Sequence, residues 1–138
     1  MKIGDRCKIY SNILPAEPFL VEIGDDVTIS SEVAFCTHDN SIIKVDRCCP
    51  NLFGKISIGS NSFLGMRSTI MLGVTIPNNV IVAAGSVVTT SFQEENIIIG
   101  GNPAKIIGKW NDFILKNRDF SQSRYDVKKI YMQILNCL

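Results

Sequence analysis

The 138-residue sequence lacks the features that mark several large protein classes. No apolar run approaches the roughly 20 residues that span a bilayer, because the richest stretch, Ile97 to Ile99, ends at glycines. The formal net charge of +1 gives no support to nucleic-acid binding, which usually depends on a marked basic excess. No P-loop or dinucleotide fingerprint occurs, since Gly100-Gly101 does not have the required strand-loop-helix spacing. We therefore expect a soluble protein without a membrane span or a nucleic-acid partner.

Cysteine and histidine usage limits the possible chemistry further. The five cysteines are odd in number, contain no CxxC spacing and follow no signal peptide, which favours a reduced cytoplasmic protein. His38 is the only histidine, so a three-histidine zinc site is excluded and we expect no metal. The Cys48-Cys49 pair leaves a cysteine nucleophile as an alternative, although no second histidine is available to activate either thiol.

The length and charge distribution indicate one domain with a basic end. A chain of 138 residues can bury a core without help from disulfides. Residues 1–104 hold seven Lys and Arg against ten Asp and Glu, whereas residues 105–138 hold seven against three. This basic end is compatible with an anionic ligand and equally with a solvated helix face.

An aliphatic or aromatic residue recurs at every sixth position over much of the chain. The uninterrupted run is Ile58, Leu64, Ile70, Ile76, Val82 and Val88, and the same spacing returns at Ile3 and Ile9 and at Ile23, Ile29 and Phe35. Helices repeat their apolar positions every three to four residues and half-buried strands every second one, so neither gives this period. Six-residue steps are typical of a β-helix made from hexapeptides. If three hexapeptides form a triangular coil, Ile58 stacks under Ile76, with coils about 4.8 Å apart.

Two interruptions break the repeat. Between Ile9 and Ile23 the spacing is fourteen residues, which predicts a coil that bulges near Pro15 and Pro18. The larger interruption predicts a loop over residues 41–54 that protrudes from one corner of the prism. Long loops in compact domains are more often functional than ornamental.

His38 lies at the root of the predicted loop, in the sequence Thr37-His38-Asp39-Asn40. A free imidazole has a pKa near 6.5, which makes it the natural general base at neutral pH. Most single histidines are structural, so residue type alone does not establish a functional role for His38. The position at the only large insertion favours a functional role.

The C-terminal part of the chain departs from the repeat. The repeat fades after Val88, resumes at Ile97 to Ile99 and ends in Gly100-Gly101-Asn102-Pro103. Helical spacing follows, in a short turn at Trp110, Phe113 and Ile114 and, after Asp126, at Val127, Ile130, Tyr131, Ile134 and Leu135. Because a repeat stack exposes apolar surface and strand edges at its ends, we expect the helical extension 110–138 to cap a β-helix of residues 1–109.

Four features together resemble the left-handed β-helix acyltransferases. They are the hexapeptides, the histidine before a loop, the stretch Val82-Ala83-Ala84-Gly85-Ser86-Val87-Val88-Thr89, and the motif Gly101-Asn102-Pro103-Ala104-Lys105. Over residues 1–109 the chain is similar to sugar O-acetyltransferases of the galactoside and maltose type and to enzymes that acetylate bacterial surface polysaccharides. The resemblance implies an all-β, left-handed parallel β-helix, a homotrimer with active sites between neighbouring subunits, and acetyl-CoA as the donor.

The resemblance also implies roles for single residues. His38 matches the catalytic base, which would remove the proton of an acceptor hydroxyl for direct transfer without an acyl-enzyme. The backbone N–H of Met66 matches the oxyanion donor. The main chain of Ala84 matches a contact to the pantetheine arm of coenzyme A, and Thr89 matches the next contact.

Lysines complete the implied coenzyme site. Lys105 matches the basic position that meets the phosphates, and Lys109 is a further cation nearby in sequence. Thr90 stands where many relatives have a lysine, which predicts weaker binding of the coenzyme.

The acceptor side departs from the resemblance. Galactoside-type enzymes hold the sugar with a side-chain amide at the position of Tyr10, and here Asn12 lies close by in sequence. Asn40, beside His38, is a further candidate for substrate binding. Asp39 is not expected to orient the imidazole, because neighbours on one strand point apart.

Several alternatives remain open. After a sugar hydroxyl, the next candidates for the acceptor are the hydroxyl of a streptogramin or chloramphenicol-like antibiotic and the amine of an amino sugar. A non-catalytic scaffold is favoured by Thr90 and by the missing amide at Tyr10. An enzyme is favoured by His38, the loop and Lys105 together.

Overall fold

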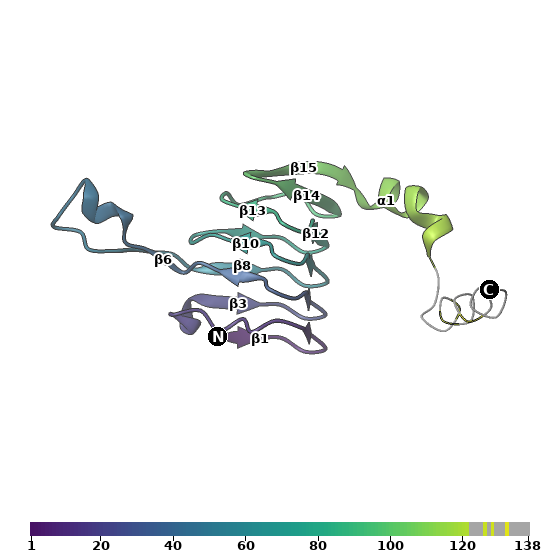
Figure 1. Ribbon diagram of the computed structural model, residues 1–138, viewed down its shortest axis with the longest axis horizontal. Helices are drawn as coiled ribbons and strands as arrows, with labels where there is room; N and C mark the ends of the chain where they lie inside the picture. The colour runs from purple at the N-terminus through teal and green to yellow at the C-terminus, as the bar shows by residue number, and fades with distance from the viewer. Residues whose placement is uncertain (122–125, 127, 129–131, 133–138) are drawn as a thin grey trace.

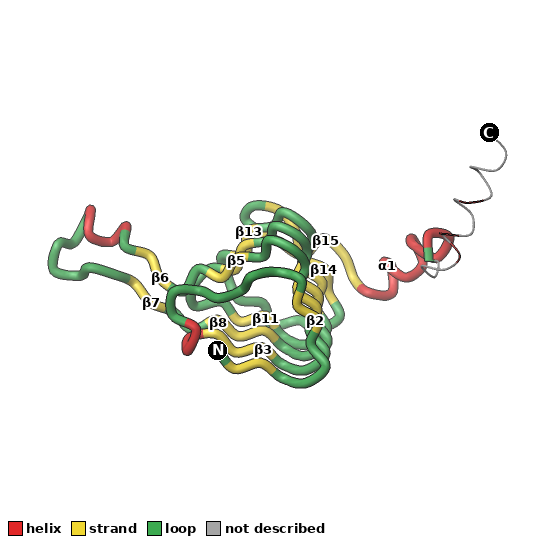
Figure 2. Tube along the Cα trace, turned by 60° about the horizontal axis from the view of Figure 1, so that its bottom comes forward, coloured by secondary structure: helices red, strands yellow, loops and turns green. Residues whose placement is uncertain are grey.

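The computed structural model describes residues 1–121, 126, 128 and 132, and its strands wind into a stack of triangular coils (Figures 1 and 2). A hairpin leaves this stack on one side and a short helix on the opposite side. No helix in the described part of the chain is both long and apolar enough to cross a bilayer.

Three sheets form the faces of the prism. The first face consists of the parallel strands β1 (Lys2–Ile3), β3 (Val21–Ile23), β8 (Ile56–Ile58) and β11 (Thr75–Ile76). The second face consists of β2 (Lys8–Ile9), β4 (Thr28–Ile29), β9 (Phe63–Leu64), β12 (Val80–Val82), β14 (Ile97–Gly101) and β15 (Ala104–Lys109). The third face consists of β5 (Ala34–Phe35), β10 (Thr69–Ile70) and β13 (Val87–Val88).

Strand pairing confirms the predicted stacking of residues one coil apart. The parallel pairs are Ile58 with Ile76, Leu64 with Val82, and Ile70 with Val88. All six side chains are at most 3% exposed. Burial of each one stabilises the fold by roughly 1.5–3 kcal/mol, so these positions contribute a large part of the core.

The first coil behaves differently although its residues share the phase of the repeat. Ile3 is 42% exposed and Ile9 is 38% exposed. No coil lies beneath β1 and β2, which are the end strands of their sheets, so nothing covers these side chains from that side. The repeat therefore places Ile3 and Ile9 in the correct strand register but overestimates the burial of their side chains.

Three corners join the faces, and we number them in chain order. The first corner contains the turn residues Asp5, Asp25, Ser60 and Asn78. The second corner contains Ser31, Met66 and Ala84. The third corner contains Thr37, Gly73 and Ser91.

The turns at the first two corners use left-handed backbone. Asp26, Asn61 and Asn79, whose residue types tolerate this conformation, have φ between 54 and 58°. Arg6, Glu32 and Arg67 adopt φ between 57 and 60° as well. The stacking of the coils imposes this conformation on residues whose type does not favour it.

The two interruptions of the repeat form irregular segments. The larger is a hairpin of β6 (His38–Asp39) and β7 (Leu52–Phe53), which are antiparallel and enclose a 3-10 helix at Ser41–Lys44. Its strands begin at His38, ahead of the predicted loop start at residue 41. The smaller interruption carries a 3-10 helix at Pro18–Leu20.

The described residues do not confirm the prediction that a C-terminal helix caps the stack. Helix α1 (Trp110–Asn117) has no buried residue and leads away from the coils (Figure 1). Instead, β15 turns back antiparallel on β14 and pairs with its backbone. A 3-10 helix at Arg118–Phe120 follows α1. The predicted helical positions Val127, Ile130, Tyr131, Ile134 and Leu135 lie outside the described residues.

Candidate active site

His38 is paired with a carboxylate that comes from the other interruption of the repeat. The Nδ1 atom of His38 lies 2.9 Å from Oε2 of Glu17. Glu17 stands directly before the 3-10 helix at Pro18–Leu20, whereas His38 opens the hairpin. The side chains are 40% and 18% exposed, so the imidazole is open to solvent while the carboxylate is largely covered.

Thr37 completes this cluster. Its hydroxyl donates to the same Oε2 atom of Glu17 at 2.5 Å, and the residue is 2% exposed. The Thr37 hydrogen bond, followed by the His38 hydrogen bond, lowers the pKa of Glu17 below its ordinary value. The carboxylate is therefore ionised and accepts from both neighbours.

The pairing fixes which ring nitrogen of His38 can act as a base. An ionised carboxylate only accepts hydrogen bonds, so Nδ1 of a neutral imidazole carries the proton. Nε2 then keeps its lone pair and can accept a proton from a bound hydroxyl. This is the arrangement that general-base catalysis requires.

The remaining residues at the neck of the hairpin surround the imidazole without competing for it. Asp39 Oδ1 accepts from the Ser41 N–H at 2.7 Å, and the backbone and side-chain hydrogen bonds of Ser41 lower the Asp39 pKa. The ring of Phe53 lies with its centroid 6.0 Å from that of His38. Asn40 is exposed and precedes the 3-10 helix of the hairpin, next to His38 in the chain.

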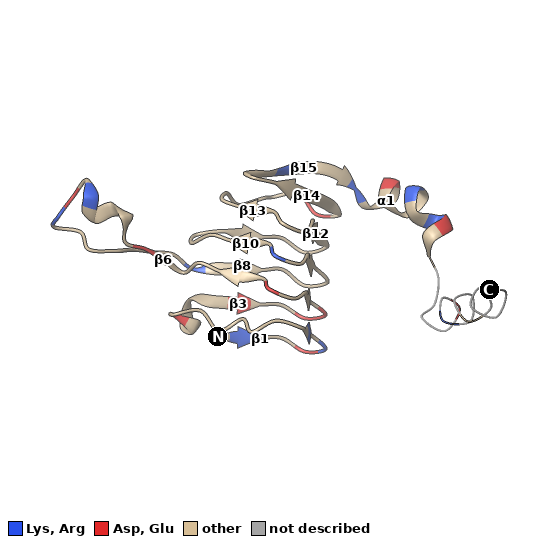
Figure 3. Ribbon diagram, viewed as in Figure 1, with Lys and Arg blue, Asp and Glu red and all other residues tan. Residues whose placement is uncertain are grey.

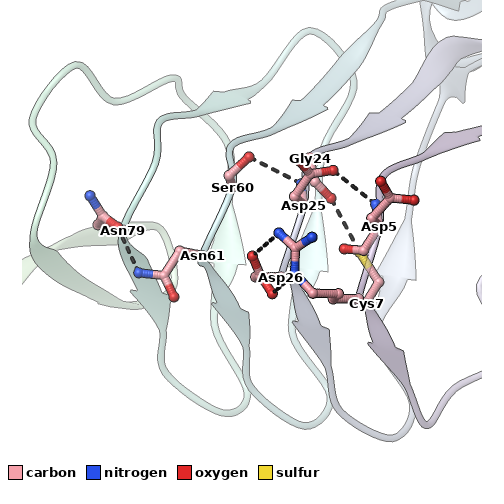
Figure 4. A network of polar contacts seen from close by, with 9 residues as sticks. Asp5, Cys7, Gly24, Asp25, Asp26, Ser60, Asn61 and Asn79 are labelled. Atoms are coloured by element: carbon pink, nitrogen blue, oxygen red, sulfur yellow. Dashed lines mark hydrogen bonds and ion pairs between the residues drawn. The ribbon is translucent and has the colours of Figure 1, made fainter.

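The first corner satisfies its own turn amides. The N–H of Asp5 donates to Asp25 Oδ1 at 2.8 Å, and the N–H of Asp25 donates to Ser60 Oγ at 3.0 Å (Figure 4). The N–H of Ser60 in turn donates to Asn78 Oδ1 at 2.8 Å. Each oxygen comes from the next coil, so a ladder of side chains closes this corner.

The second corner lacks such a ladder. Its turn residues one and two coils above Ser31 are Met66 and Ala84, whose side chains have no oxygen. Among the hydrogen bonds of the described residues, none is donated by the N–H of Met66 or of Ala84. These two amides are stacked one coil apart, since the N–H of Gly85 donates to the Met66 carbonyl at 2.8 Å. Free, fixed N–H groups of this kind can hold a carbonyl or an oxyanion.

Lys105 is brought to the second corner, whereas Lys109 is not. Gly100 lies above this corner, because a side chain there would meet Ala83 Cβ at 3.0 Å, and Lys105 pairs with Gly100 in the β14–β15 ladder. Lys109 pairs with Ile97 at the far end of β15, as the blue segments at its two ends show (Figure 3).

The other predicted contacts fall at different corners. Thr89 follows β13 and is exposed at the third corner, the corner that also gives rise to His38. Tyr10 follows β2 on the side of the second corner and is 65% exposed. Asn12 is close to Tyr10, and its Oδ1 accepts from the Leu14 N–H at 3.4 Å.

The predicted site residues thus form two groups within one chain. His38 and Thr89 lie at the third corner, and Met66, Ala84 and Lys105 lie at the second corner. The third face, formed by β5, β10 and β13, separates the two corners. A single copy of the chain does not bring the base and the free amides together.

Glu17 is the site residue that the sequence did not predict. It is separated from His38 by 21 positions and belongs to no hexapeptide. The sequence feature that could have predicted Glu17 is its place in the interruption between Ile9 and Ile23. This interruption and the hairpin both leave the stack near the third corner. Residues in the two breaks of a repeat are candidates for contact.

Close packing at the second corner yields a first prediction. A side chain at Gly65 would place Cβ 2.5 Å from Ala84 N and 2.6 Å from Val82 O, both rigid backbone atoms. We expect Gly65→Ala to lower the free energy of unfolding by about 1–3 kcal/mol, because the coils must separate beside Met66 and Ala84. Urea unfolding measures this effect.

Gly108→Ala is the matched control. A Cβ there meets only Ile98 side-chain atoms at 3.7 Å or more, which is ordinary contact. Its free energy of unfolding should remain close to that of the unmodified protein. Equal behaviour of the two variants would contradict the role assigned to the packing at Gly65.

No group of three or more His, Cys, Asp or Glu side chains in the described residues could hold a metal ion.

Known proteins resemble this chain in sequence and in fold. Residues 55–90 match the hexapeptide repeat of succinyl-transferase. The chain is 43% identical to protein CapG of Staphylococcus aureus over 141 residues, which covers 96% of this chain and 81% of CapG. It is 30% identical to the galactoside O-acetyltransferase of Escherichia coli K12 over 111 residues, which covers 80% of this chain and 54% of that protein.

A solved structure agrees with these relatives. The hexapeptide-repeat acetyltransferase of Vibrio cholerae O1 biovar eltor in complex with acetyl coenzyme A matches with a TM-score of 0.71 and 30% identity, covering 78% of this chain and 59% of that one. The chain therefore spans less than two thirds of the length of the Escherichia coli and Vibrio proteins.

Proposed function

Because the chain belongs to the hexapeptide-repeat acetyltransferases, we propose that it moves an acetyl group from acetyl-CoA to a hydroxyl of a sugar or a surface-polysaccharide precursor. The observation that carries this proposal is the contact of His38 Nδ1 with Glu17 Oε2 at 2.9 Å. It leaves Nε2 as the acceptor atom of a general base.

His38 acts on the acceptor in this mechanism. Nε2 takes the proton of the acceptor hydroxyl as its oxygen attacks the thioester carbonyl, and the C–O bond forms. The charge on the tetrahedral oxygen is stabilised by the free N–H of Met66. When the C–S bond breaks, the imidazolium returns the proton to the thiolate, so coenzyme A leaves as a thiol and His38 is neutral again.

Coenzyme A is held by the second corner. The free N–H of Ala84 donates to a pantetheine carbonyl, and Lys105 lies on β15, two strands beyond β12, where it attracts the phosphates as a point charge. Lys109, at the other end of β15, is too far along the strand to join Lys105 at one phosphate, since the strand rises about 3.3 Å per residue. Thr89 contributes from the third corner.

The site is completed between subunits of a homotrimer. The third corner of one subunit, with His38 and Thr89, faces the second corner of the next, with Met66 and Ala84. The separation of these groups by the third face supports this assembly. Sedimentation should give a mass three times 15.3 kDa, and a fully active monomer would contradict the shared site.

A thiol-release screen tests the proposed reaction. Free sugars, nucleotide sugars and polysaccharide fragments are offered with acetyl-CoA, together with an amino sugar and a chloramphenicol-like alcohol as competing acceptor classes. Acceptor-dependent release with a hydroxyl sugar supports the proposal. Calorimetry with coenzyme A is the second arm, and the absence of binding would indicate a scaffold instead of an enzyme.

The pH dependence of turnover follows from the state of Glu17. The Thr37 and His38 hydrogen bonds lower the Glu17 pKa, so the carboxylate stays charged as the pH falls below neutral. We expect log kcat/KM to fall with a slope no steeper than one between roughly pH 7 and 5, because Glu17 takes up no proton there. A slope of two in this range would show that Glu17 titrates together with the base.

A further inference from the structure

We propose that Thr37 is a positioning residue for the base: its hydroxyl fixes the Glu17 carboxylate, which in turn holds His38 with Nδ1 as donor and Nε2 as acceptor. This inference deepens the proposed function and rests on it, because it concerns how the base of that reaction is prepared. It adds a third member to the pair of Glu17 and His38.

The anchoring of Thr37 makes it suited to this role. The residue is 2% exposed, and its carbonyl accepts from the Gly54 N–H at 3.1 Å, so the backbone is fixed where the hairpin leaves the stack. Glu17 instead arrives on the irregular segment ahead of Pro18, and its side chain makes no helix-cap hydrogen bond there. The rigid partner is therefore the hydroxyl, and the carboxylate is the part that needs to be held.

One oxygen atom carries both contacts. Glu17 Oε2 accepts from Thr37 Oγ1 at 2.5 Å and from His38 Nδ1 at 2.9 Å. Without the hydroxyl, the carboxylate can rotate about its terminal bond and the Nδ1 contact is no longer enforced. Because both donors meet Oε2, loss of the first contact loosens the second.

Other charged groups near the imidazole do not replace Glu17. Asp39 adjoins His38 in the chain, but its Oδ1 accepts from the Ser41 N–H inside the hairpin. The ring of Phe53 covers His38 from β7 and is apolar. Among the described residues, Glu17 is the carboxylate that contacts the ring, so the tautomer of His38 depends on this single partner.

The lone histidine permits a direct test. Protein labelled with 15N-histidine gives the ring signals of His38 alone, and the two nitrogen shifts report which one carries the proton. We expect the Nδ1–H form to dominate in the neutral imidazole. In Thr37→Val the signals should move toward a mixture of tautomers, and Thr37→Ser, which keeps the hydroxyl, should restore the original form.

Glu17→Gln tests the same contact from the other side and guards against a misfolded Thr37→Val. The amide should redistribute the tautomers as Thr37→Val does. Tautomer signals that are identical in the unmodified protein, Thr37→Val and Glu17→Gln would overturn the proposal. The measurement needs no substrate, so it stands apart from any failure to find an acceptor.

Turnover provides a second, independent readout. Thr37→Val should lower kcat by about tenfold with little change in KM, because the lost contact is to a charged group that orients the base. In a Glu17→Gln background the same substitution should have no further effect, since Thr37 acts through Glu17. An equal loss in both backgrounds would mean a structural role and overturn the inference.

The outcomes of the two proposals are separable. Full turnover of a His38→Gln variant would defeat the proposed mechanism while leaving the tautomer result intact. Unchanged tautomers with a His38-dependent activity would defeat only the role of Thr37.

Discussion

Replacing His38 by glutamine is expected to lower kcat by roughly 10²- to 10⁴-fold, the usual contribution of a positioned general base. Glutamine is close in size and can still form a hydrogen bond to Glu17, but it cannot take up a proton at neutral pH. The side chain is 40% exposed and lies outside the buried core, so the fold should persist. Thiol release and circular dichroism measure the two effects.

Cysteine variants in the same hairpin are the matched control. Cys48 and Cys49 are exposed, free thiols, and a cysteine nucleophile is the competing chemistry for this loop. Cys48→Ser and Cys49→Ser should retain full turnover. Activity that survives in His38→Gln but disappears with either thiol would replace the general-base mechanism by nucleophilic catalysis.

Ile70→Ala is expected to cost about 2–5 kcal/mol of folding free energy. The side chain is 0% exposed in β10, the central strand of the third face, and it stacks between Phe35 and Val88. Removing its outer carbons leaves a cavity that coils bonded above and below cannot close. Because the third face separates the two halves of the proposed site, activity should decline with stability.

Thr69→Ala on the same strand is the control for this prediction. The Thr69 side chain points to the outside of the prism and is only partly buried. Its cost should stay below about 1 kcal/mol. Urea unfolding of both variants should be compared at one protein concentration, because an assembling chain gains stability by mass action. Equal losses would mean that the repeat positions do not form the core.

The sequence predicted the stack well because its period reports geometry directly. A fixed step of six residues between aliphatic positions fits a triangular coil of three hexapeptides. The pairs of Leu64 with Val82 and Ile70 with Val88 confirm this geometry. The family was expected from resemblance, because the hexapeptides occur together with a histidine before a loop and two further motifs, and the relatives confirm it. The end of the stack was missed because Ile97 to Ile99 and the following apolar residues pair with each other across a turn, which a search for helical spacing overlooks.

The site was predicted less completely. His38 was found because it is unique and stands beside an interruption, but Glu17 was not, since its contact depends on how two irregular segments fold toward one corner. The free amides of Met66 and Ala84 were expected only from resemblance. Their physical basis is that methionine and alanine supply no oxygen where Asp25, Ser60 and their neighbours do so at the first corner.

The ends of the hairpin formed by β6 and β7 are close enough together for its outer part to vary without disturbing the coils. Since the Gly54 N–H meets the Thr37 carbonyl at 3.1 Å, the chain leaves and re-enters the coils at almost the same point. The two ends of the hairpin therefore lie next to each other in the stack, whatever the length of chain between them. Lengthening a loop whose ends are already close costs little free energy. A relative can thus exchange the part of this segment beyond His38, altering which molecules reach the imidazole while the coils and the base itself are kept.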